Sequence, residues 1–406
     1  MTETVRDNDG HPGPLSDLRV VEMGQLLAGP FAAQLFADFG AEVIKLEPPN
    51  QGDPLRVWGK ERTNGKALWW SVLGRNKKSV TCNLRLPDGQ QLARDIIATA
   101  DVLIENFRSG TIERWGMSPD ELWAINPRLV ILRVTGFGQS GPMQYEAGYG
   151  AVGEAMGGLR HVTGDPDRMP SRAGISIGDT LAATFGTVGA LMALHARERT
   201  GKGQIVDSAL YEAVLAVMES LVIDYDQAGY VRERTGSILP KIAPSNVYET
   251  SDGQMLIAGN GDTIWRRMAA GMDRPELAED PRFADHTARG ENQAELDEVI
   301  TTWTRTKTNA EVDAIMTESK VPHGKIFTAA EMLEDAQFKA RESIIRVMHP
   351  EFGQVAMQNA FPRLSDTPGQ VRWVGPQLGE HTDEILKNVL GKTDAELAKL
   401  READVI

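Results

Sequence analysis

The sequence contains a single cysteine, Cys82, among its 406 residues. One thiol cannot form a disulfide within the chain, and it cannot supply a cysteine-based metal site. The seven histidines are scattered without an HExxH pattern or paired spacing, so the sequence gives no support to metal catalysis. This cysteine usage fits a reducing compartment, and we expect a cytoplasmic protein.

Positive charge and long apolar runs are also scarce. Lys and Arg number 43 against 57 Asp and Glu, which gives a formal net charge of −14. That balance argues against broad nucleic-acid binding, because a phosphate backbone requires a basic surface. We see no run of about 18 apolar residues and therefore expect no membrane span. The polar start of the chain, residues 1–17, does not resemble a signal peptide and is predicted to be a flexible tail.

Strand and helix patterns alternate along the first half of the chain. Apolar strand patterns are followed by helical patterns at 28–40, 87–100 and 118–127, and the strands are expected at 18–23, 41–47, 78–84, 101–107 and 128–137. This alternation predicts an α/β fold with a mostly parallel sheet covered on both faces. Ligands bind such sheets at the carboxyl ends of the strands, so the loops after Met23, Phe107 and Phe137 are the first places to look.

The regular alternation of strand and helix patterns ends after about residue 215. A hairpin pattern at 246–260 surrounds an Asp-Gly turn, and helical patterns follow it, which predicts a smaller α+β domain. A chain of 406 residues is long enough for two domains. We assign 18–215 and 330–406 to a large domain, and 216–329 to a small domain with its linkers.

The segment GFGQSG, residues 136–141, matches the pattern of a dinucleotide-binding loop, but its surroundings do not fit. Pro142 follows where that fingerprint requires a helix, and no acidic residue stands at the usual distance on a second strand. We interpret the segment as a loop at a strand end, where the backbone passes close to a ligand.

Cations gather in two short segments of this acidic chain. GRNKKS, residues 74–79, is either a solvated turn or part of an anion site, and the sequence leaves both interpretations open. ENFRSGTIERWG, residues 105–116, places Arg108 and Arg114 just past a strand end. Guanidinium groups bind phosphate, and the nearby Phe107 ring can meet a base. Together the two segments suit an anionic, nucleotide-like ligand.

A single carboxylate, Asp179, stands in RAGISIGDTLAATFG, residues 172–186, directly before a helical pattern that starts at Thr180. The apolar stripe of that predicted helix comprises Leu181, Phe185, Val188 and Met192. The local sequence favours an N-cap role, because an Asp oxygen accepts hydrogen bonds from the first N–H groups of a helix. The same position favours an ionised carboxylate, which can act as a nucleophile without a partner base.

The motifs together resemble one family, the class III coenzyme A transferases of the CaiB/BaiF or formyl-CoA transferase type. The matching segments run in order from about residue 18 to 391: LRVVEMGQLLAGPF, DFGAEVIKLEPPNQGDPLR, NKKSVTCNL, ADVLIENFRSGTIERWG, INPRLVILRVTGFGQSGP, AGYGAVGEAMGGL, GISIGDTLAATFG, TGKGQIVDSALYEA and LGEHTDEIL. The resemblance implies a Rossmann-like large domain built from both ends of the chain, a small domain and an interlocked homodimer. It also implies coenzyme A thioesters as substrates and no tightly bound cofactor.

By the same resemblance, Asp179 is the catalytic aspartate. Coenzyme A contacts are implied at Leu27, Ala28, Leu84, Arg85, Asn106, Phe107, Arg108, Arg114, Thr135 and Phe137. Two positions depart from formyl-CoA transferases, because Pro48 stands in place of an arginine and Thr135 in place of a lysine. Other cations must then hold the phosphates, and Arg85, Arg108 and Arg114 are our candidates.

The implied chemistry is a covalent double displacement. The aspartate attacks a thioester to form an anhydride, the released thiolate forms an aspartyl-CoA thioester, and an acceptor acid then takes the coenzyme. Further candidates for oxyanion or substrate binding are Gln25, Tyr149, Arg160, Arg172, Gly259 and Gly261. The two arginines either bind a second substrate carboxylate or pair with Glu154 or Asp165.

The segments VEMGQLLAGPF and TGDPDRMPSRAGISIGD are most similar in sequence to those of family members that act on short dicarboxylic acids. We therefore expect succinyl-CoA or a similar donor, and a short dicarboxylate as acceptor. The small domain keeps only Gly259-Asn260-Gly261 of a longer glycine-rich loop, which argues against formate or oxalate.

Two alternatives stay open from the sequence. One is a racemase of the same family, although those enzymes need a histidine where this chain has Tyr149, and a phenol with a pKa of about 10 is a poor base at neutral pH. The other is a non-catalytic partner subunit of a heteromeric transferase, against which the retained Asp179 counts.

Overall fold

The computed structural model describes residues 13–406, which divide by their contacts into two compact units. Of the described residues, unit 1 comprises 13–159, 173–220 and 340–406, and unit 2 comprises 160–172 and 221–339. The predicted domain boundaries differ from these, because residues 160–172 and 330–339 group with unit 2 and residues 216–220 with unit 1. Of the predicted tail, residues 13–17 form a turn in which Leu15 N–H donates to the Phe39 carbonyl at 3.0 Å.

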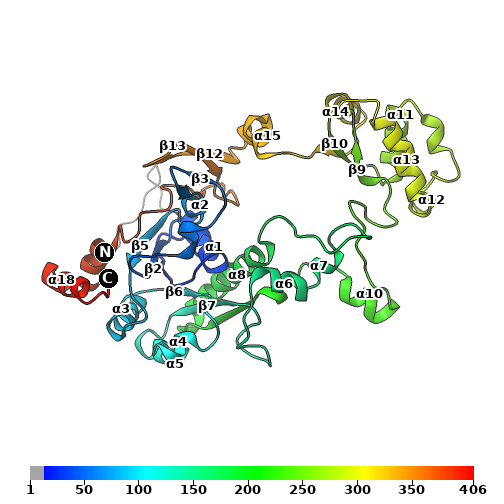
Figure 1. Ribbon diagram of the computed structural model, residues 1–406. Helices are drawn as coiled ribbons and strands as arrows, with labels where there is room; N and C mark the ends of the chain where they lie inside the picture. Colours follow the sequence, from blue (N-terminus) through cyan, green and yellow to red (C-terminus); the bar gives the residue numbers. More distant parts are fainter. Residues whose placement is uncertain (1–12) are drawn as a thin grey trace. The chain divides into compact units, whose positions relative to one another are not determined.

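Unit 1 is built on a six-stranded parallel sheet, which confirms the predicted fold class (Figure 1). In spatial order the strands are β5 (Lys77–Thr81), β2 (Glu42–Glu47), β1 (Arg19–Glu22), β6 (Val102–Glu105), β7 (Val130–Thr135) and β8 (Ile205–Ala209). Every neighbouring pair is parallel, so the carboxyl ends of all the strands share one edge. The strand order reverses between β1 and β6, where such sheets bind ligands.

Helices cover both faces of this sheet, because alternate residues of each strand point to opposite sides. On one face Val20, Val43 and Val102 pack with α1 (Ala28–Asp38) and α8 (Ile177–Thr200). The other face packs against α3 (Pro87–Ile97) and α17 (Thr382–Leu390). Both faces of a parallel sheet must be buried in this way, and the near-continuous apolar strands satisfy the requirement.

The remaining elements of unit 1 are short. They are η1 (Pro54–Val57), β3 (Arg62–Thr63), β4 (Lys66–Ala67), α2 (Trp69–Leu73), α4 (Thr111–Arg114), α5 (Pro119–Ile125), α6 (Gly150–Met156), α9 (Leu210–Leu215), β12 (Ile344–His349), β13 (Gly353–Gln358) and α18 (Asp394–Glu402). Strands β12 and β13 pair antiparallel. The short helices α7 (Leu159–Val162) and α16 (Ala336–Ala340) cross the boundaries between the two units.

Helix α8 has one buried face, and that face is made of small residues. Ala182, Ala183, Gly186 and Ala190 are buried in it, and they pack in the cluster that covers the sheet. Small side chains allow the helix to approach the sheet and α1 closely. Of the predicted apolar stripe, Leu181 packs against this cluster, whereas Phe185, Val188 and Met192 are 43%, 42% and 66% exposed on the chain by itself.

Among residues 13–406, α8 is the one helix that is long and apolar enough to cross a membrane. No long apolar run marks this helix in the sequence, because glycine and threonine residues divide its apolar residues into short runs. The buried small residues on one side of α8 are nevertheless typical of a core helix that covers a sheet.

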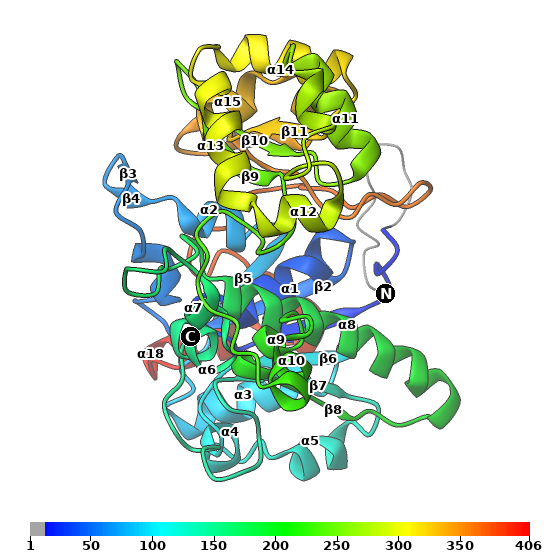
Figure 2. The ribbon, with the colours of Figure 1, turned by 90° about the vertical axis from the view of Figure 1, so that its right-hand side faces the viewer.

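Unit 2 surrounds a three-stranded antiparallel sheet with the order β11-β10-β9. The strands are β9 (Ser245–Glu249), β10 (Gln254–Ala258) and β11 (His323–Lys325), and the first two form the predicted hairpin. Figure 2 shows α11 (Asp262–Gly271), α13 (Gln293–Thr304) and α14 (Asn309–Glu318) beside this sheet. The other elements are α10 (Leu221–Ala228), η2 (Pro275–Ala278), α12 (His286–Glu291) and α15 (Ala329–Glu334).

Candidate active site

Asp179 lies in the first turn of α8, and it is not the N-cap. The helix begins at Ile177, and the N-cap residue is Ser176, whose side chain makes no capping hydrogen bond. The predicted N-cap role was wrong because the helix starts before Thr180, ahead of the apolar pattern. The Asp179 side chain is half-buried. The partial positive charge of a helix N-terminus favours an ionised carboxylate in this first turn.

Two glycines make room for the Asp179 carboxylate. A Cβ atom on Gly150 would lie 2.1 Å from Asp179 Oδ2, far inside any real contact. A Cβ atom on Gly178 would lie 2.8 Å from the Gly150 carbonyl oxygen. The first turns of α6 and α8 therefore meet through glycine, and the carboxylate occupies space that any larger residue at position 150 would fill.

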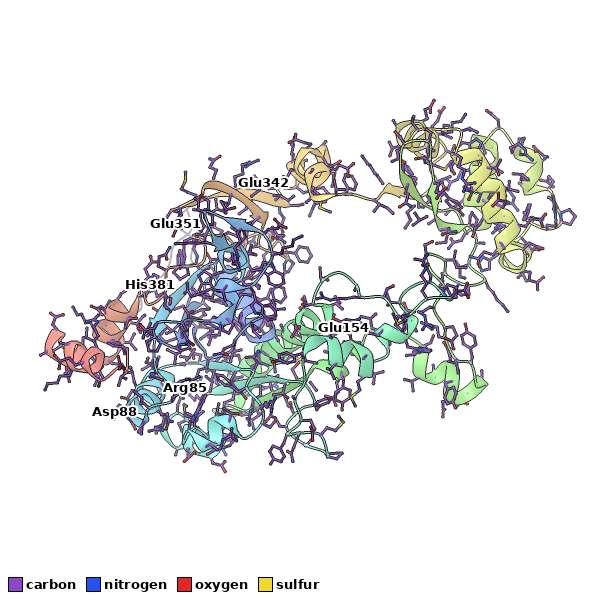
Figure 3. All side chains as sticks on the ribbon, in the orientation of Figure 1. Arg85, Asp88, Glu154, Glu342, Glu351 and His381 are labelled. Atoms are coloured by element: carbon purple, nitrogen blue, oxygen red, sulfur yellow. The ribbon has the colours of Figure 1, made fainter. Side chains whose placement is uncertain are left out.

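Glu154 is a second carboxylate at this helix contact. It lies on α6 (Figure 3) and is 1% exposed. A Cβ atom on Gly178 would be 3.4 Å from its Cγ atom. The sequence suggested Glu154 only as a partner for Arg160 or Arg172. The signal for its burial was present, since GAVGEAM surrounds a lone acid with small and apolar residues. Tyr149, directly before α6, is 67% exposed.

The residues assigned to coenzyme A follow four strands of the sheet and lie along its carboxyl edge. Leu27 and Ala28 follow β1, Leu84 and Arg85 follow β5, and Asn106, Phe107 and Arg108 follow β6, while Thr135 ends β7 and Phe137 follows it. Arg114 ends α4, which follows β6. One parallel sheet thus brings together segments that are up to about a hundred residues apart, as ligand sites at such edges require.

Asn106 joins the β1 and β6 loops at the point where the strand order reverses. Its Oδ1 accepts from Gln25 N–H at 2.7 Å, and its Nδ2 donates to the Gln25 carbonyl at 2.9 Å. The neighbouring Phe107 ring packs edge-on against Trp115, with 5.1 Å between ring centroids. Asn106 therefore holds the backbone of Gln25, and Phe107 has an aromatic partner of its own.

The three cations proposed for the phosphates are available to a ligand. Arg85, Arg108 and Arg114 are all exposed, and within residues 13–406 none of the three forms an ion pair. Arg114 Nη2 donates only to Thr111 Oγ1, at 3.1 Å. Figure 3 shows Arg85 near Asp88, where α3 begins. These exposed guanidinium groups can meet anionic oxygens without breaking a buried contact.

The cations of residues 74–79 are structural, and both sequence interpretations of them were wrong. Arg75 is buried and forms a pair with Asp38, with 2.5 Å between Nη2 and Oδ2. Lys77 is fully buried, and its Nζ lies 2.7 Å from Glu22 Oε2. Lys78 Nζ is 2.7 Å from a carboxylate oxygen of Glu384. These charges are neither solvated nor open to an anion, because carboxylates of unit 1 already pair with them.

GFGQSG forms a loop, as the sequence predicts, and two side chains organise it. Gly138 has a φ of +82°, and its N–H donates to Thr135 Oγ1 at 3.0 Å. The next N–H, of Gln139, donates to Asp207 Oδ2 at 2.8 Å. Thr135, which stands where formyl-CoA transferases have a lysine, thus holds the backbone of this loop in place. Phe137 in the same loop is only 8% exposed.

Sequence reasoning missed a buried ion cluster beneath the β1 loop. Lys45 Nζ lies 2.7 Å from Glu22 Oε1 and 2.7 Å from Asp53 Oδ2, and it also donates to the Gly24 carbonyl. The three charged side chains are 1% exposed or less. Burial lowers the pKa of Lys45, but the charges of Asp53 and Glu22 outweigh burial and raise it. A lysine inside the apolar strand EVIKLE was the available signal, because lysine is rarely buried without partners.

Four of the candidates, Arg160, Arg172, Gly259 and Gly261, belong to unit 2, while the others belong to unit 1. Arg160 is half-buried on α7, and Arg172 is exposed in the segment before α8. Each of these two arginines has an interaction within the chain. The side chains named as catalytic and coenzyme-binding therefore all come from unit 1.

The two glycine candidates differ in whether their N–H groups are occupied. Gly259 N–H donates to the Pro244 carbonyl at 2.9 Å, so it is not available to an oxyanion. Within residues 13–406, Gly261 N–H has no acceptor. Gly261 precedes α11 as its N-cap residue, with a φ of −76°. Only Gly261 of the pair retains the backbone donor that the oxyanion hypothesis requires.

Arg289 holds this loop from inside unit 2. Its side chain is fully buried, and it donates to the Asn260 carbonyl at 2.7 Å and to Asp262 Oδ1 at 2.7 Å. It also donates to the carbonyls of Ala243 at 3.1 Å and Phe283 at 3.2 Å. The guanidinium thus binds oxygen acceptors of the loop and does not involve the N–H group of Gly261.

Histidines and metal ligands contribute no further site. Among residues 13–406, no group of three or more His, Cys, Asp and Glu side chains could hold a metal ion. His381 Nδ1 accepts from Ser79 N–H at 3.3 Å, and His323 Nδ1 lies 2.8 Å from the Val321 carbonyl oxygen. His161 and His195 are exposed.

Known proteins resemble this chain over nearly its whole length. The family described as CoA-transferase family III matches residues 15–382. A Chloroflexus aurantiacus protein named succinyl-CoA–D-citramalate CoA-transferase is 56% identical over 97% of this chain and 98% of its own. The beta subunit of succinyl-CoA–L-malate CoA-transferase from the same organism is 39% identical over the same shares of the two chains. The crystal structure of a CaiB/BaiF family protein from Brucella suis superposes with a TM-score of 0.84 at 35% identity, covering 93% of this chain and 99% of that one.

Proposed function

The chain belongs to CoA-transferase family III, the class III or CaiB/BaiF enzymes, and we propose that it moves coenzyme A from succinyl-CoA to a short dicarboxylic acid. The names of two relatives support this donor, since both pair succinyl-CoA with a dicarboxylic acid. Citramalate is the first acceptor to test, because its relative shares 56% of aligned residues against 39% for the malate enzyme.

Asp179 is the nucleophile in this proposal. The observation that carries it is the placement of its carboxylate, half-buried in the first turn of α8, in space left by Gly150. An aspartate is already charged at neutral pH, so it needs no histidine to remove a proton. The exchange consumes no proton, because every attacking group and every leaving group in it is an anion.

The exchange balances as two matched half-reactions. Asp179 attacks the thioester carbonyl, the C–S bond breaks, and the thiolate leaves behind a mixed anhydride. The thiolate then attacks the aspartyl carbonyl and releases succinate, which leaves coenzyme A on Asp179 as a thioester. The acceptor carboxylate repeats these steps in reverse and regenerates the aspartate. Water must be excluded throughout, because it would hydrolyse the anhydride.

The carboxyl edge of the parallel sheet is the proposed coenzyme site. Arg85, Arg108 and Arg114 are exposed there and form no ion pair within residues 13–406, which suits the phosphates of coenzyme A. Gln25 follows β1 at the reversal of strand order, and its backbone is held by Asn106. The Gln25 side chain is the proposed polar contact for the thioester end of the acyl-CoA, whereas the three arginines are proposed to bind its phosphates.

A nucleophile test separates the role of Asp179 from the activity itself. Purified protein is incubated with succinyl-CoA and D-citramalate, L-malate or glutarate, and new thioesters are identified by mass. We expect Asp179→Asn and Asp179→Ala to lower transfer by about a thousandfold or more, because no covalent intermediate can form. Gly150→Ala should lower it by about tenfold to a hundredfold, since its Cβ displaces the carboxylate.

Asp394→Asn is the matched control, since Asp394 is also an acidic residue in the first turn of a helix, far along the chain in α18. It should transfer coenzyme A at the wild-type rate. Undiminished transfer by Asp179→Ala would remove Asp179 from the mechanism while leaving the transferase activity established. Absence of any new thioester with every acid would contradict the substrate proposal.

The acceptor's second carboxylate is assigned to Arg160 or Arg172. The chemical argument is that a second carboxylate leaving water requires a cation. We expect Arg172→Met to weaken dicarboxylic acceptors far more than monocarboxylic ones, measured as KM values in the same assay. Equal losses for both classes of acid would assign Arg172 to a structural role.

We also propose that the active form contains a second copy of this chain. Exposed apolar residues on α8 support it, together with Val152 and Met156 of α6, which are 42% and 49% exposed. Helices α6 and α8 contact each other, and apolar surface exposed on neighbouring helices is typical of a protein interface. Light scattering after size exclusion should give twice the chain mass, and Met192→Glu should lower it. An active monomer, or a requirement for a different subunit, would contradict the proposal.

A further inference from the structure

The turn between β1 and α1 has its backbone polar groups held by side chains of other segments. The Gly24 carbonyl accepts from Lys45 Nζ, and Leu26 N–H donates to Asp53 Oδ1 at 3.1 Å. Between them, Asn106 binds both the N–H and the carbonyl of residue 25. A turn in which two successive N–H groups and two carbonyls are bound by buried or half-buried side chains has one strongly preferred conformation.

Leu26 adopts an unusual backbone conformation within this turn. Its φ is +65°, in the left-handed region that side chains other than glycine and asparagine rarely occupy. Such a conformation persists only where surrounding contacts over-determine it, and it is concentrated at functional sites. The contact from Asp53 to Leu26 N–H is the one that fixes the strained residue directly.

The Lys45–Asp53 pair is anchored on both sides. Glu22 accepts from Lys45 through Oε1, and its Oε2 lies 2.7 Å from Lys77 Nζ. Lys77 in turn donates to the Pro30 carbonyl in the first turn of α1, at 2.7 Å. The cluster therefore ties β1, β2 and β5 to both ends of the segment that carries Gln25, Leu27 and Ala28. No member of the cluster is more than 1% exposed, so none can contact a substrate.

We propose that Lys45 and Asp53 are positioning residues for coenzyme A transfer. They hold the Gly24–Leu27 turn with Leu26 left-handed, so that Gln25 and the start of α1 meet the thioester in one geometry. The inference rests on the proposed function, because it takes these residues as contacts of the acyl-CoA. Displacement of a contact group by about 1 Å is enough to lower a rate about a hundredfold.

Three variants and one matched control test this role. Lys45→Met and Asp53→Ala each remove one anchor of the turn, and Asp53→Asn keeps an oxygen for Leu26 N–H while removing the charge. Arg75→Met is the control, because it breaks the Arg75–Asp38 pair, which is equally buried in unit 1 but does not contact the turn. All four should lower stability towards urea, since each leaves a buried charge without its partner.

The expected kinetics differ between the turn and the control. Lys45→Met and Asp53→Ala should lower kcat by about thirtyfold or more with KM for succinyl-CoA changed by less than about threefold, because phosphate contacts lie elsewhere. Asp53→Asn should recover at least about fivefold of the kcat lost in Asp53→Ala, since the acceptor for Leu26 N–H remains. Arg75→Met should keep kcat within about twofold of wild type.

Hydrogen exchange at the amides of Gln25 and Leu26 gives a readout independent of activity. Both should exchange at least about tenfold faster in Asp53→Ala than in Arg75→Met. Unchanged kcat and unchanged exchange in the Lys45 and Asp53 variants would overturn the inference, as would equal kcat losses in all four variants. If wild-type protein transfers no coenzyme A but the exchange result holds, the proposed function fails while the anchoring of the turn stands.

Discussion

The Gly24–Leu27 turn of unit 1 and the Gly259–Asp262 loop of unit 2 are both held by buried charged side chains, but in different ways. In unit 1 the holding groups take N–H donors as well as carbonyl acceptors, from Gly24 to Leu26. In unit 2 Arg289 takes only oxygen atoms, and the N–H of Gly261 is left without an acceptor in the described chain. The first turn can therefore offer a ligand its side chains, whereas the second can offer backbone donors.

Glycine also serves different purposes in the two segments. The strained position of the unit 1 turn is occupied by leucine, at a φ of +65°, whereas Gly261 has an ordinary φ of −76°. Gly259 is needed for space, since a Cβ atom there would lie 2.8 Å from Met268 Sδ. A glycine in a candidate loop therefore does not by itself indicate backbone strain. Buried side chains that bind the backbone can hold a residue other than glycine in a left-handed conformation.

Removal of Arg289 is the strongest way to test whether the two units are anchored separately. Arg289→Met leaves the carbonyls of Ala243, Asn260 and Phe283 without their donor, and it should destabilise unit 2 by about 3–5 kcal/mol. Hydrogen exchange at the amides of α11 in rising urea measures this change, because Trp265 of α11 packs against Phe283 in the unit 2 core.

The single cysteine reports on unit 1 in the same experiment. Cys82 is buried, and burial raises the pKa of its thiol to about 12, so it reacts slowly while unit 1 stays folded. We expect Cys82 labelling in Arg289→Met to follow the wild-type urea curve. A labelling curve that moves together with the α11 exchange transition would show that the two units unfold as one.

A proline at position 261 tests the role of the unused N–H group in the unit 2 loop. Gly261→Pro removes the unused N–H, and a φ of −76° is already compatible with proline. If that donor stabilises the developing oxyanion, kcat should fall by about tenfold to a hundredfold or more. Gly261→Ala is the control, because it keeps the N–H and its Cβ would meet nothing closer than Ile264 at 3.6 Å. Equal rates for the two variants would exclude the donor role.

Glycine at position 26 gives the smallest expected effect. Leu26→Gly relieves a left-handed strain of about 1–2 kcal/mol. Glycine also raises the entropy of the unfolded chain, which offsets about 0.5–1 kcal/mol of that gain. The free energy of unfolding should therefore change by less than about 1.5 kcal/mol, measured with urea. A loss above about 3 kcal/mol would mean that packing of the leucine side chain, and not the anchored backbone, sets the turn.

The sequence predicted the parallel sheet and the edge that carries the candidate site, because strand and helix periodicities are local. It placed the start of α8 after Asp179, since the glycine and serine residues before it carry no apolar periodicity. The exposed stripe of Phe185, Val188 and Met192 was visible as apolar spacing, but spacing cannot say whether the sheet or another chain covers it.

The sequence by itself determined the fold class, the family resemblance and the position of Asp179 at the head of an apolar helix. Only the tertiary structure decided which cations are structural and which are open to a ligand. Arg75 and Lys77 are buried against carboxylates 37 and 55 residues earlier in the chain, at Asp38 and Glu22, whereas Arg85 and Arg108 are exposed. The reason is physical: a buried charge is stable only beside its partner, and folding alone brings such distant partners together.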